Sequence, residues 1–243
     1  MNLYREQGVV LRTWKLGEAD RIVVLLTQGE GKVRAVAKGV RKTKSRFGGR
    51  LEPFSHVDLS LYRGRELDIV TQVEVINPFR TLREDYDRVV AGTAMLEAVD
   101  QVAQEREGAI RLYVLLVRAL RTLDGAPRDP SVVLDAFLLK LMALEGYRPA
   151  LAECAGCGRQ AAALRCFSIA RGGGLCERCR SGEESTLDQG TMPLLAALLG
   201  DDLDTSAAAT PPPGSRREAG ALIRGYVEYH LERRLRSYPL VAR

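Results

Sequence analysis

The sequence lacks most of the residues and motifs on which catalysis or membrane insertion depends. Among 243 residues there are two histidines, His56 and His230. His230-Leu231-Glu232 has the His-x-Glu spacing, but no Pro-Cys-x-x-Cys follows it, so neither histidine belongs to a complete zinc-deaminase signature. A Gly-Lys-Ser/Thr phosphate-binding loop is also missing, so nucleotide hydrolysis is not expected. No apolar run approaches the roughly 20 residues of a membrane-spanning helix, and the start of the chain has no apolar signal-peptide core. We therefore expect a cytoplasmic protein that is not an enzyme and has no membrane partner.

Aromatic residues are sparse, at 6%, but nothing else in the composition indicates disorder. Hydrophobic residues make up 46% and charged residues 28% of the chain, which is ordinary for a globular protein. At 243 residues the chain is long enough for one large or two small domains, each with its own core.

The excess of positive charge is confined to the first third of the chain. Residues 1–80 hold 15 Lys and Arg against 9 Asp and Glu, a net charge of +6, whereas residues 81–243 hold 21 against 22, a net charge of −1. No amphipathic basic helix accompanies this excess, so a membrane surface is the weaker explanation. The asymmetry favours a nucleic acid as the partner of the N-terminal part.

Residues 8–76 have the period-two pattern of short strands broken by glycine and proline. The expected strands are 8–14, 21–27, 32–37, 56–62 and 67–76. Five strands in about 70 residues, with the longest connection after the third strand, match the OB-fold, a small Greek-key barrel that often binds single strands. A five-stranded SH3-like barrel remains open on this pattern.

After residue 78 the period changes to three or four, which predicts helices. The expected helices are 86–97, 110–120, 132–145 with Ser131 as its N-cap, 187–199 and 215–236. Residues 201–214 offer little apolar surface and are expected to form a flexible linker. The predicted fold is α+β multidomain: an OB-fold β-barrel at 1–80, then an all-α helical domain at 81–243 with an inserted four-cysteine zinc-binding motif at about 150–182.

Four of the five cysteines form two Cys-x-x-Cys pairs, Cys154 with Cys157 and Cys176 with Cys179. The eighteen residues between the pairs fall in the range of four-cysteine zinc sites. Four thiolates complete a tetrahedral shell around Zn²⁺ and leave no position for substrate, so the expected ion is single and structural. A redox pair is the alternative, but redox pairs do not normally occur twice at this spacing. Cys166, between the pairs, is expected to be an ordinary buried thiol.

The densest charge lies between residues 32 and 50, with eight basic side chains and no acidic one. A surface that serves only solubility usually mixes signs, so this stretch is the candidate DNA-binding site. Phe47, Trp14 and Tyr62 are each able to stack on a base or to pack against the barrel. The candidate DNA-binding residues are Lys32, Arg34, Lys38, Arg41, Lys42, Lys44, Arg46 and Arg50.

Ordered motifs along nearly the whole chain resemble the RecO family of bacterial recombination-repair proteins. In the first half they are Gly8-Val9-Val10-Leu11-Arg12-Thr13, Gly17-Glu18-Ala19-Asp20-Arg21, Ala37-Lys38-Gly39-Val40-Arg41 and Leu51-Glu52-Pro53-Phe54. In the second half they are Gly146-Tyr147-Arg148-Pro149, the two Cys-x-x-Cys pairs, Gly173-Gly174 and Leu235-Arg236-Ser237.

This resemblance implies a recombination mediator in DNA repair. It would bind single- and double-stranded DNA, anneal complementary strands, and with RecR load RecA onto strands coated by single-strand DNA-binding protein. The implied partners are RecR and the acidic C-terminal tail of that coating protein, with RecA indirectly, at the cytoplasmic nucleoid. Two alternatives stay open: an RNA-binding or transcription-associated zinc protein, and a nucleic-acid-processing enzyme.

Overall fold

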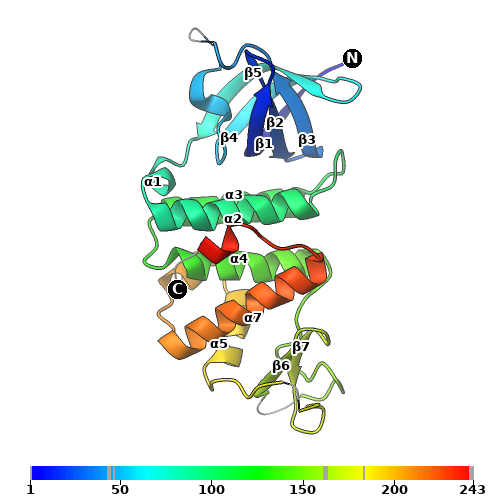
Figure 1. The fold of residues 1–243 in the computed structure, drawn as a ribbon, viewed down its shortest axis with the longest axis vertical. Helices are drawn as coiled ribbons and strands as arrows, with labels where there is room; N and C mark the ends of the chain where they lie inside the picture. Colours follow the sequence, from blue (N-terminus) through cyan, green and yellow to red (C-terminus); the bar gives the residue numbers. More distant parts are fainter. Residues whose placement is uncertain (1, 43–44, 46, 161–163, 183, 241–243) are drawn as a thin grey trace. The chain divides into compact units, whose positions relative to one another are not determined.

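The structure, a computed structural model, describes residues 2–42, 45, 47–160, 164–182 and 184–240. These residues form two compact units, 1–125 and 126–243, and each is described by itself (Figure 1). The expected residues Lys44 and Arg46 lie outside the described part of the chain.

A closed five-stranded barrel forms the N-terminal part of the first unit (Figure 1). Its strands are β1 (Leu3–Leu16), β2 (Asp20–Thr27), β3 (Gly31–Ala37), β4 (His56–Tyr62) and β5 (Asp68–Asn77). The strand order is β1-β2-β3-β5-β4, and β4 pairs with β1 to close the barrel. Among the paired strands of the described barrel, β3 and β5 are parallel, and this Greek-key closure is that of the OB-fold rather than the SH3-like barrel.

Alternate side chains of each strand fill the barrel because successive residues point to opposite faces. Val23 and Leu25 of β2 and Ala35 of β3 are fully buried in this core. Phe47, in the connection after β3, is 1% exposed and packs into the same core together with Leu51, in the short 3-10 helix Gly48–Leu51. Phe47 therefore plugs the barrel and is not free to stack on a base.

Three helices complete the first unit: α1 (Arg80–Arg83), α2 (Tyr86–Val102) and α3 (Ile110–Asp124). Asp85 caps α2 by accepting a hydrogen bond from the Arg88 backbone N–H, 2.9 Å away. Helices α2 and α3 pack against β1, and α3 also packs against β2. Between α3 and the barrel, Nε2 of the buried His56 lies 2.7 Å from the Tyr113 hydroxyl, so His56 is a structural core residue.

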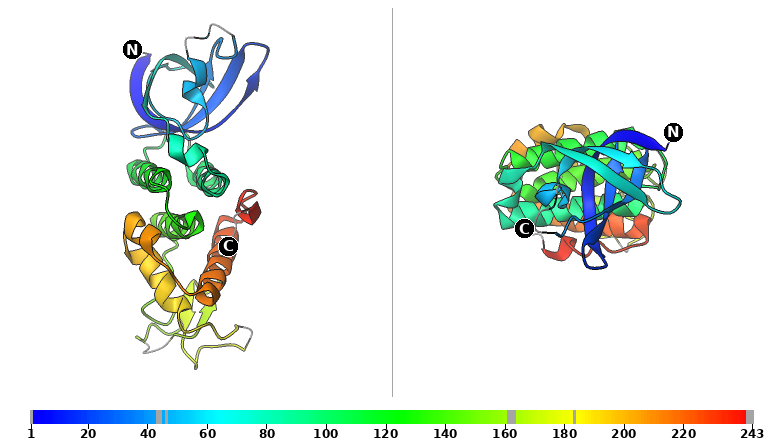
Figure 2. Two further views of the ribbon diagram at one scale, coloured as in Figure 1. Left: turned by 90° about the vertical axis from the view of Figure 1, so that its left-hand side faces the viewer. Right: turned by 90° about the horizontal axis from the view of Figure 1, so that it is seen from above.

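The second unit is built around α4 (Pro130–Leu144), which packs against α5 (Thr191–Gly200) and α7 (Pro213–Leu231) (Figures 1 and 2). Ser131 was expected to cap α4, but the cap is Asp129, whose side chain accepts from the Ser131 N–H at 2.9 Å. Pro130 fits the first helical turn, because a backbone N–H at that position has no acceptor within the helix and proline lacks this N–H. In the described part of the chain, no helix is both long and apolar enough to cross a membrane.

The segment expected to be a flexible linker contains a helix, α6 (Leu203–Ala208). Asp202 caps it by accepting from the Thr205 N–H at 2.7 Å, and the helix buries Leu203 and Ser206, with α6 packed on α4. The prediction of a flexible linker was wrong: it was based on the small number of apolar residues and did not consider Asp202 as a helix cap.

A buried ion pair connects α4 to α7. Asp135 is 0% exposed and binds the guanidinium of Arg216, which also donates to the Ser131 hydroxyl. The Tyr238 hydroxyl donates to the other oxygen of Asp135 at 2.9 Å and brings the C-terminal segment onto the same carboxylate. Arg216 is therefore a core residue and is not available to a nucleic acid.

Candidate nucleic-acid interface and metal centre

Two cross-strand rows define the outer face of β1, β2 and β3. One row places Arg12 beside Val24 and Val24 beside Arg34, and the next places Trp14 beside Ile22 and Ile22 beside Val36. These residues alternate with the barrel core residues and so point away from it. The row with Arg12 at one end and Arg34 at the other thus lies next to the row that begins with Trp14, the only tryptophan of the chain.

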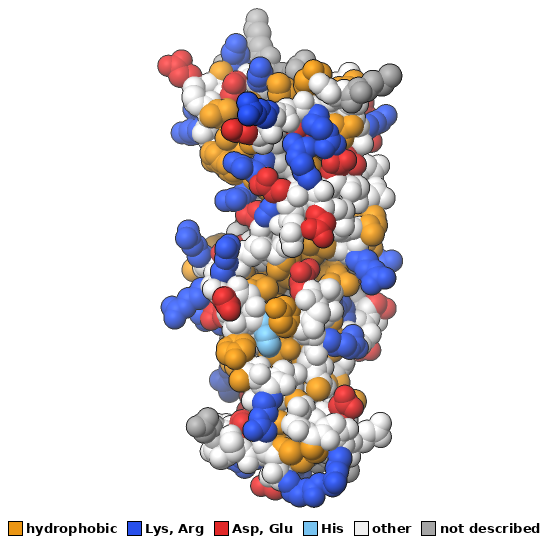
Figure 3. Space-filling model, turned by 90° about the vertical axis from the view of Figure 1, so that its right-hand side faces the viewer, with side chains coloured by type: hydrophobic (Ala, Val, Ile, Leu, Met, Phe, Trp, Pro, Cys, Tyr) orange, Lys and Arg blue, Asp and Glu red, His pale blue; other side chains and the backbone are white. Residues whose placement is uncertain are grey.

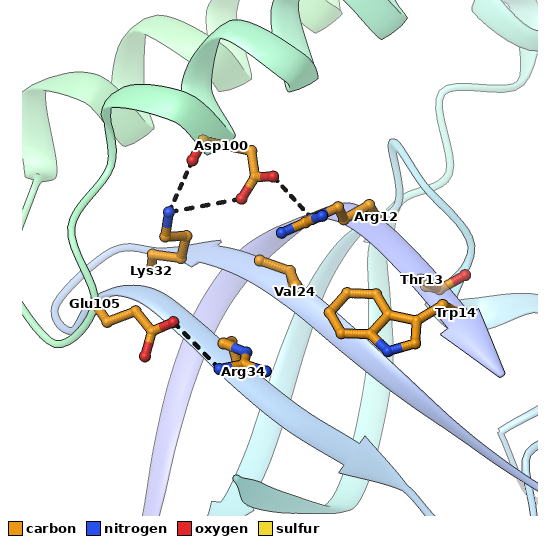
Figure 4. A pocket seen from close by; sticks show the side chains of 8 residues that line it. All are labelled: Arg12, Thr13, Trp14, Val24, Lys32, Arg34, Asp100 and Glu105. Atoms are coloured by element: carbon orange, nitrogen blue, oxygen red, sulfur yellow. Dashed lines mark hydrogen bonds and ion pairs between the residues drawn. The ribbon is translucent and has the colours of Figure 1, made fainter. Parts of the chain in front are cut away.

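Acidic side chains compensate the cations of this face (Figure 4). Asp100, in the last turns of α2, lies 2.8 Å from Arg12 Nε and 3.6 Å from Lys32 Nζ. Glu105 lies 3.7 Å from Arg34. Lys32 and Arg34, both expected to bind DNA, are therefore already paired in the first unit.

The segment that carries Glu105 is fixed to β3 by its backbone. The Lys32 N–H donates to the Gln104 carbonyl at 3.0 Å, and the Arg106 N–H donates to the Lys32 carbonyl at 3.1 Å. Gly31 permits this approach, because a Cβ at that position would lie 1.8 Å from the Glu107 carbonyl oxygen. Arg106 also pairs with the buried Asp68 at 3.0 Å, which anchors the segment to β5.

The connection after β3 carries further cations. Lys38, Arg41, Lys42 and Arg50 are exposed, and within the described residues no ion pair is formed by Lys38 or Lys42. Arg41 donates to the carbonyls of Gly17 at 3.2 Å and Glu18 at 2.7 Å, so it also holds the β1–β2 loop. Among the expected DNA-binding residues that the structure describes, Lys38 and Lys42 are thus the ones best placed to bind phosphate.

Both signs of charge occur on the barrel surface. On the face drawn in Figure 3, Lys and Arg side chains alternate with Asp and Glu side chains over the barrel and do not form a field of one sign. The excess positive charge of residues 1–80 is therefore partly neutralised at the surface, as at Arg12 and Lys32.

A pocket of about 530 Å³ opens between this barrel face and the end of α2 (Figure 4). Its walls combine cations, the two acidic side chains, Thr13, Val24 and the indole of Trp14. The Arg12 guanidinium carbon lies 5.1 Å from the centre of the Trp14 ring, within the range of a cation–π contact. Asp100 and Glu105 carry no distinctive sequence signal, because the cations that they pair with are distant along the chain. Arg12 belongs to a family motif, but its pairing with Asp100 is not visible in the sequence.

In the second unit, the four cysteines of the two Cys-x-x-Cys pairs come together. One ligand atom from each of Cys154, Cys157, Cys176 and Cys179 lies within 4.8 Å of the others, and the Cys157 and Cys176 sulfurs are 3.9 Å apart. That distance is too long for a disulfide, and all five cysteines of the chain are free. Cys166 is buried in β6 (Cys166–Ser168) and is not part of the cluster.

Tight backbone turns hold each pair of sulfurs. The Gly158 N–H donates to the Cys154 carbonyl at 2.8 Å, and the Cys179 N–H donates to the Cys176 carbonyl at 2.9 Å. Gly156 leaves room for the second pair, because a Cβ there would lie 3.2 Å from the Cys179 sulfur. The two turns project their thiols toward one another from loops on either side of β6 and β7 (Gly173–Leu175).

Hydrogen bonds and crowding shift the pKa values of these thiols in opposite directions. The Cys176 N–H donates to the Cys154 sulfur at 3.3 Å and lowers the pKa of Cys154 to about 6. Hydrogen bonding with the thiol of Cys176, and then with those of Cys157 and Cys154, raises the pKa of Cys179. The Cys154 thiol thus ionises more readily than an ordinary cysteine, whereas its neighbours disfavour a second negative charge in the cluster. The donor set therefore fits a cation, whose charge would allow all four thiols to ionise.

The fold and these two sites define a class: an α+β protein that joins an OB-type barrel to helices and carries a four-cysteine cluster able to hold a metal ion. Family models match both parts, "Recombination protein O N terminal" over residues 1–79 and "Recombination protein O C terminal" over residues 83–239. The chain belongs to the RecO family of DNA repair proteins.

Relatives with the name "DNA repair protein RecO" match over their full length. The protein of Frankia casuarinae is 49% identical over 245 residues, which cover 100% of both chains. Those of a Nocardioides species and of Thermobifida fusca are 49% and 46% identical over 247 and 245 residues, respectively. The resemblance expected from the ordered sequence motifs is thus confirmed.

Proposed function

We propose that the protein is a non-enzymatic recombination mediator. It binds single- and double-stranded DNA, anneals complementary strands, and with RecR promotes the loading of RecA onto DNA coated by single-strand DNA-binding protein, whose acidic tail is a second partner. It acts in the cytoplasm, at the nucleoid. In this proposal residues 1–80 are the DNA-binding domain and residues 81–243 the helical domain. Membership of the RecO family is the observation that carries the proposal.

The charge arrangement of the first unit supports contact with a phosphate backbone. Lys38 directly follows β3, Lys42 lies four residues further along the chain, and both are exposed. Backbone contacts of this kind respond to charge and not to base sequence, which suits a protein that must act on any strand. Annealing needs only that two backbones be neutralised while their bases remain free to pair.

We propose that the cysteine cluster binds one structural Zn²⁺. With a Zn–S distance of about 2.3 Å, the corners of a tetrahedron lie about 3.8 Å apart, which agrees with the 3.9 Å between the Cys157 and Cys176 sulfurs. Four thiolates would leave the ion no open position, so it would supply cross-linking between the two turns and no reaction chemistry.

The test is annealing of two complementary labelled oligonucleotides at low salt, without nucleotide or Mg²⁺. The protein should accelerate duplex formation, and the double variant Lys38→Glu/Lys42→Glu should bind DNA more weakly and with a smaller dependence on salt. The slope should fall by about 0.7 on single strands and about 0.9 on duplexes for each phosphate that the variant no longer neutralises. Arg233→Glu/Arg234→Glu is the matched control, since both arginines are exposed in the second unit.

The other outcomes identify the alternatives. Strand cleavage would indicate a nucleic-acid-processing enzyme, and RNA that competes better than DNA of the same sequence would indicate an RNA-binding protein. A loss of binding only in the Arg233→Glu/Arg234→Glu variant would move the site to the second unit. The RecR step is tested by formation of RecA filaments on coated single strands, which should require both RecR and this protein.

A further inference from the structure

We infer that the pocket beside Trp14 is a stacking site for an unpaired base of single-stranded nucleic acid. The inference rests on the proposed function and deepens it: the lysines after β3 bind phosphate on any strand, whereas this pocket distinguishes single strands from duplexes. In a duplex both faces of each base are covered by neighbouring pairs, so only an unpaired base can offer a face to an aromatic ring.

The indole of Trp14 is accessible and lies next to buried aliphatic residues of the neighbouring strands. Trp14 is 36% exposed, while its neighbours in the same cross-strand row, Ile22 and Val36, are 7% and 9% exposed. Directly opposed residues on one face of a sheet have Cβ atoms about 5 Å apart, which places the buried Ile22 beside Trp14. The indole lines the pocket together with the side chain of Val24 (Figure 4).

The cations of the pocket are placed to bind the backbone of a stacked nucleotide. Arg12 precedes Trp14 by two residues on the same face of β1, about 6.6 Å along the strand, and Arg34 stands at the far end of the Arg12 row. Arg12 is 59% exposed in its side chain even while it is paired with Asp100. A phosphate can therefore approach Arg12, and a base that stacks on the indole would take the ring face that Arg12 does not cover.

The other two candidate aromatic residues do not have this combination. Phe47 is inside the barrel core. Tyr62 is 45% exposed at the end of β4, but it does not line the pocket and its hydroxyl accepts a hydrogen bond from Asn2 at 3.1 Å. Tyr62 is consequently the matched control for an exposed aromatic side chain of the barrel.

Because Trp14 is the only tryptophan of the chain, its fluorescence reports this site directly in the unmodified protein. Oligothymidylate at low salt should quench the emission as a base stacks on the indole. A duplex of equal length should bind with much less quenching, and inorganic polyphosphate, which has charge but no base, should bind without it. Binding itself is followed separately by the anisotropy of a labelled strand.

Two variants provide a second measurement. Loss of one stacked base should weaken single-strand binding about tenfold to a hundredfold in Trp14→Ala, whereas Trp14→Phe keeps an aromatic face and should retain most of the affinity. Duplex affinity should change little in either variant, and Tyr62→Ala should match the unmodified protein on both substrates.

The results separate the inference from the proposed function on which it rests. No change of anisotropy with any strand would overturn DNA binding itself. Binding of oligothymidylate with unquenched Trp14 emission, or equal quenching by polyphosphate, would overturn the stacking site and leave the proposed function standing. Equal losses of single-strand and duplex affinity in Trp14→Ala would also overturn it.

Discussion

Lys32 contacts Asp100 in two ways: its Nζ donates to the Asp100 main-chain carbonyl at 2.7 Å and lies 3.6 Å from the Asp100 carboxylate. Asp100 is in the last turns of α2, where the helix dipole already carries partial negative charge. An acidic side chain is unfavourable at that position unless cations approach it, and Lys32 and Arg12 do so from the barrel. The end of α2 and the basic face of the barrel therefore stabilise each other.

The first prediction concerns this acidic residue. Asp100→Asn should strengthen DNA binding about two- to fivefold, because removal of a partly exposed ion pair of roughly 0.5–1 kcal/mol frees Arg12 and Lys32 for phosphate. The dependence on salt should become steeper. Fluorescence anisotropy at several salt concentrations measures both quantities. Glu84→Gln makes the same change of charge at an exposed site of the first unit and should have a smaller effect; equal effects would mean that only net charge matters.

The second prediction concerns the metal. Elemental analysis of protein purified without chelator should give one zinc per chain, and Cys154→Ser should lower that value and destabilise the second unit. Cys166→Ser changes a buried thiol outside the cluster and should keep the zinc. A zinc content near zero in the unmodified protein would contradict the assignment.

The third prediction concerns the buried ion pair of the second unit. Arg216→Ala should reduce the free energy of unfolding by about 3–5 kcal/mol, because it leaves the buried carboxylate of Asp135 without its cation. The neighbouring exposed residue offers the control: Arg217→Ala should change stability by about 0.5 kcal/mol or less. Denaturant titration distinguishes the two. Similar midpoints for both variants would show that Arg216 is not essential to this core.

The fourth prediction concerns pH. Burial, with a smaller contribution from the charge of Arg121, lowers the pKa of His56 from 6.5 to about 4. The unfolded chain therefore takes up a proton at higher pH than the folded chain, and stability is lost as pH falls from 6.5 toward 4, by on the order of 3 kcal/mol.

This loss should be specific to His56. Denaturant titrations of the unmodified protein and of His56→Gln at pH 7.5 and pH 4.5 give the comparison. The variant should be less stable at pH 7.5, where the contact with Tyr113 is disturbed, but should lose less stability on acidification. An identical loss in both proteins would assign the effect to other groups.

Local patterns in the sequence predicted the barrel and the cysteine cluster. The strand at His56–Tyr62 was predicted with its observed bounds, because the side chains of consecutive strand residues point to opposite faces and their alternation is visible in the local sequence. The four cysteines were expected together because each Cys-x-x-Cys turn determines the direction of its own two sulfurs. Both features depend on residues only a few positions apart.

Features that depend on distant contacts were not predictable in this way. Lys32 and Arg34 were predicted to bind DNA, but in the fold they pair with Asp100 and Glu105, which are about 70 residues away along the chain. Nothing in the local sequence distinguishes the buried Arg216 from the exposed Arg217 beside it, because the burial of Arg216 follows from the position of Asp135 on another helix. Pairings of this kind depend on tertiary packing and cannot be detected from composition or periodicity.

The close approach at Gly31 has an electrostatic consequence. Any side chain there would have to displace the backbone at Gln104 and Glu107, and the carboxylate of Glu105 would move with it. Under the proposed function, the charge that β3 presents to a nucleic acid therefore depends on the small volume of Gly31, a residue that carries no charge.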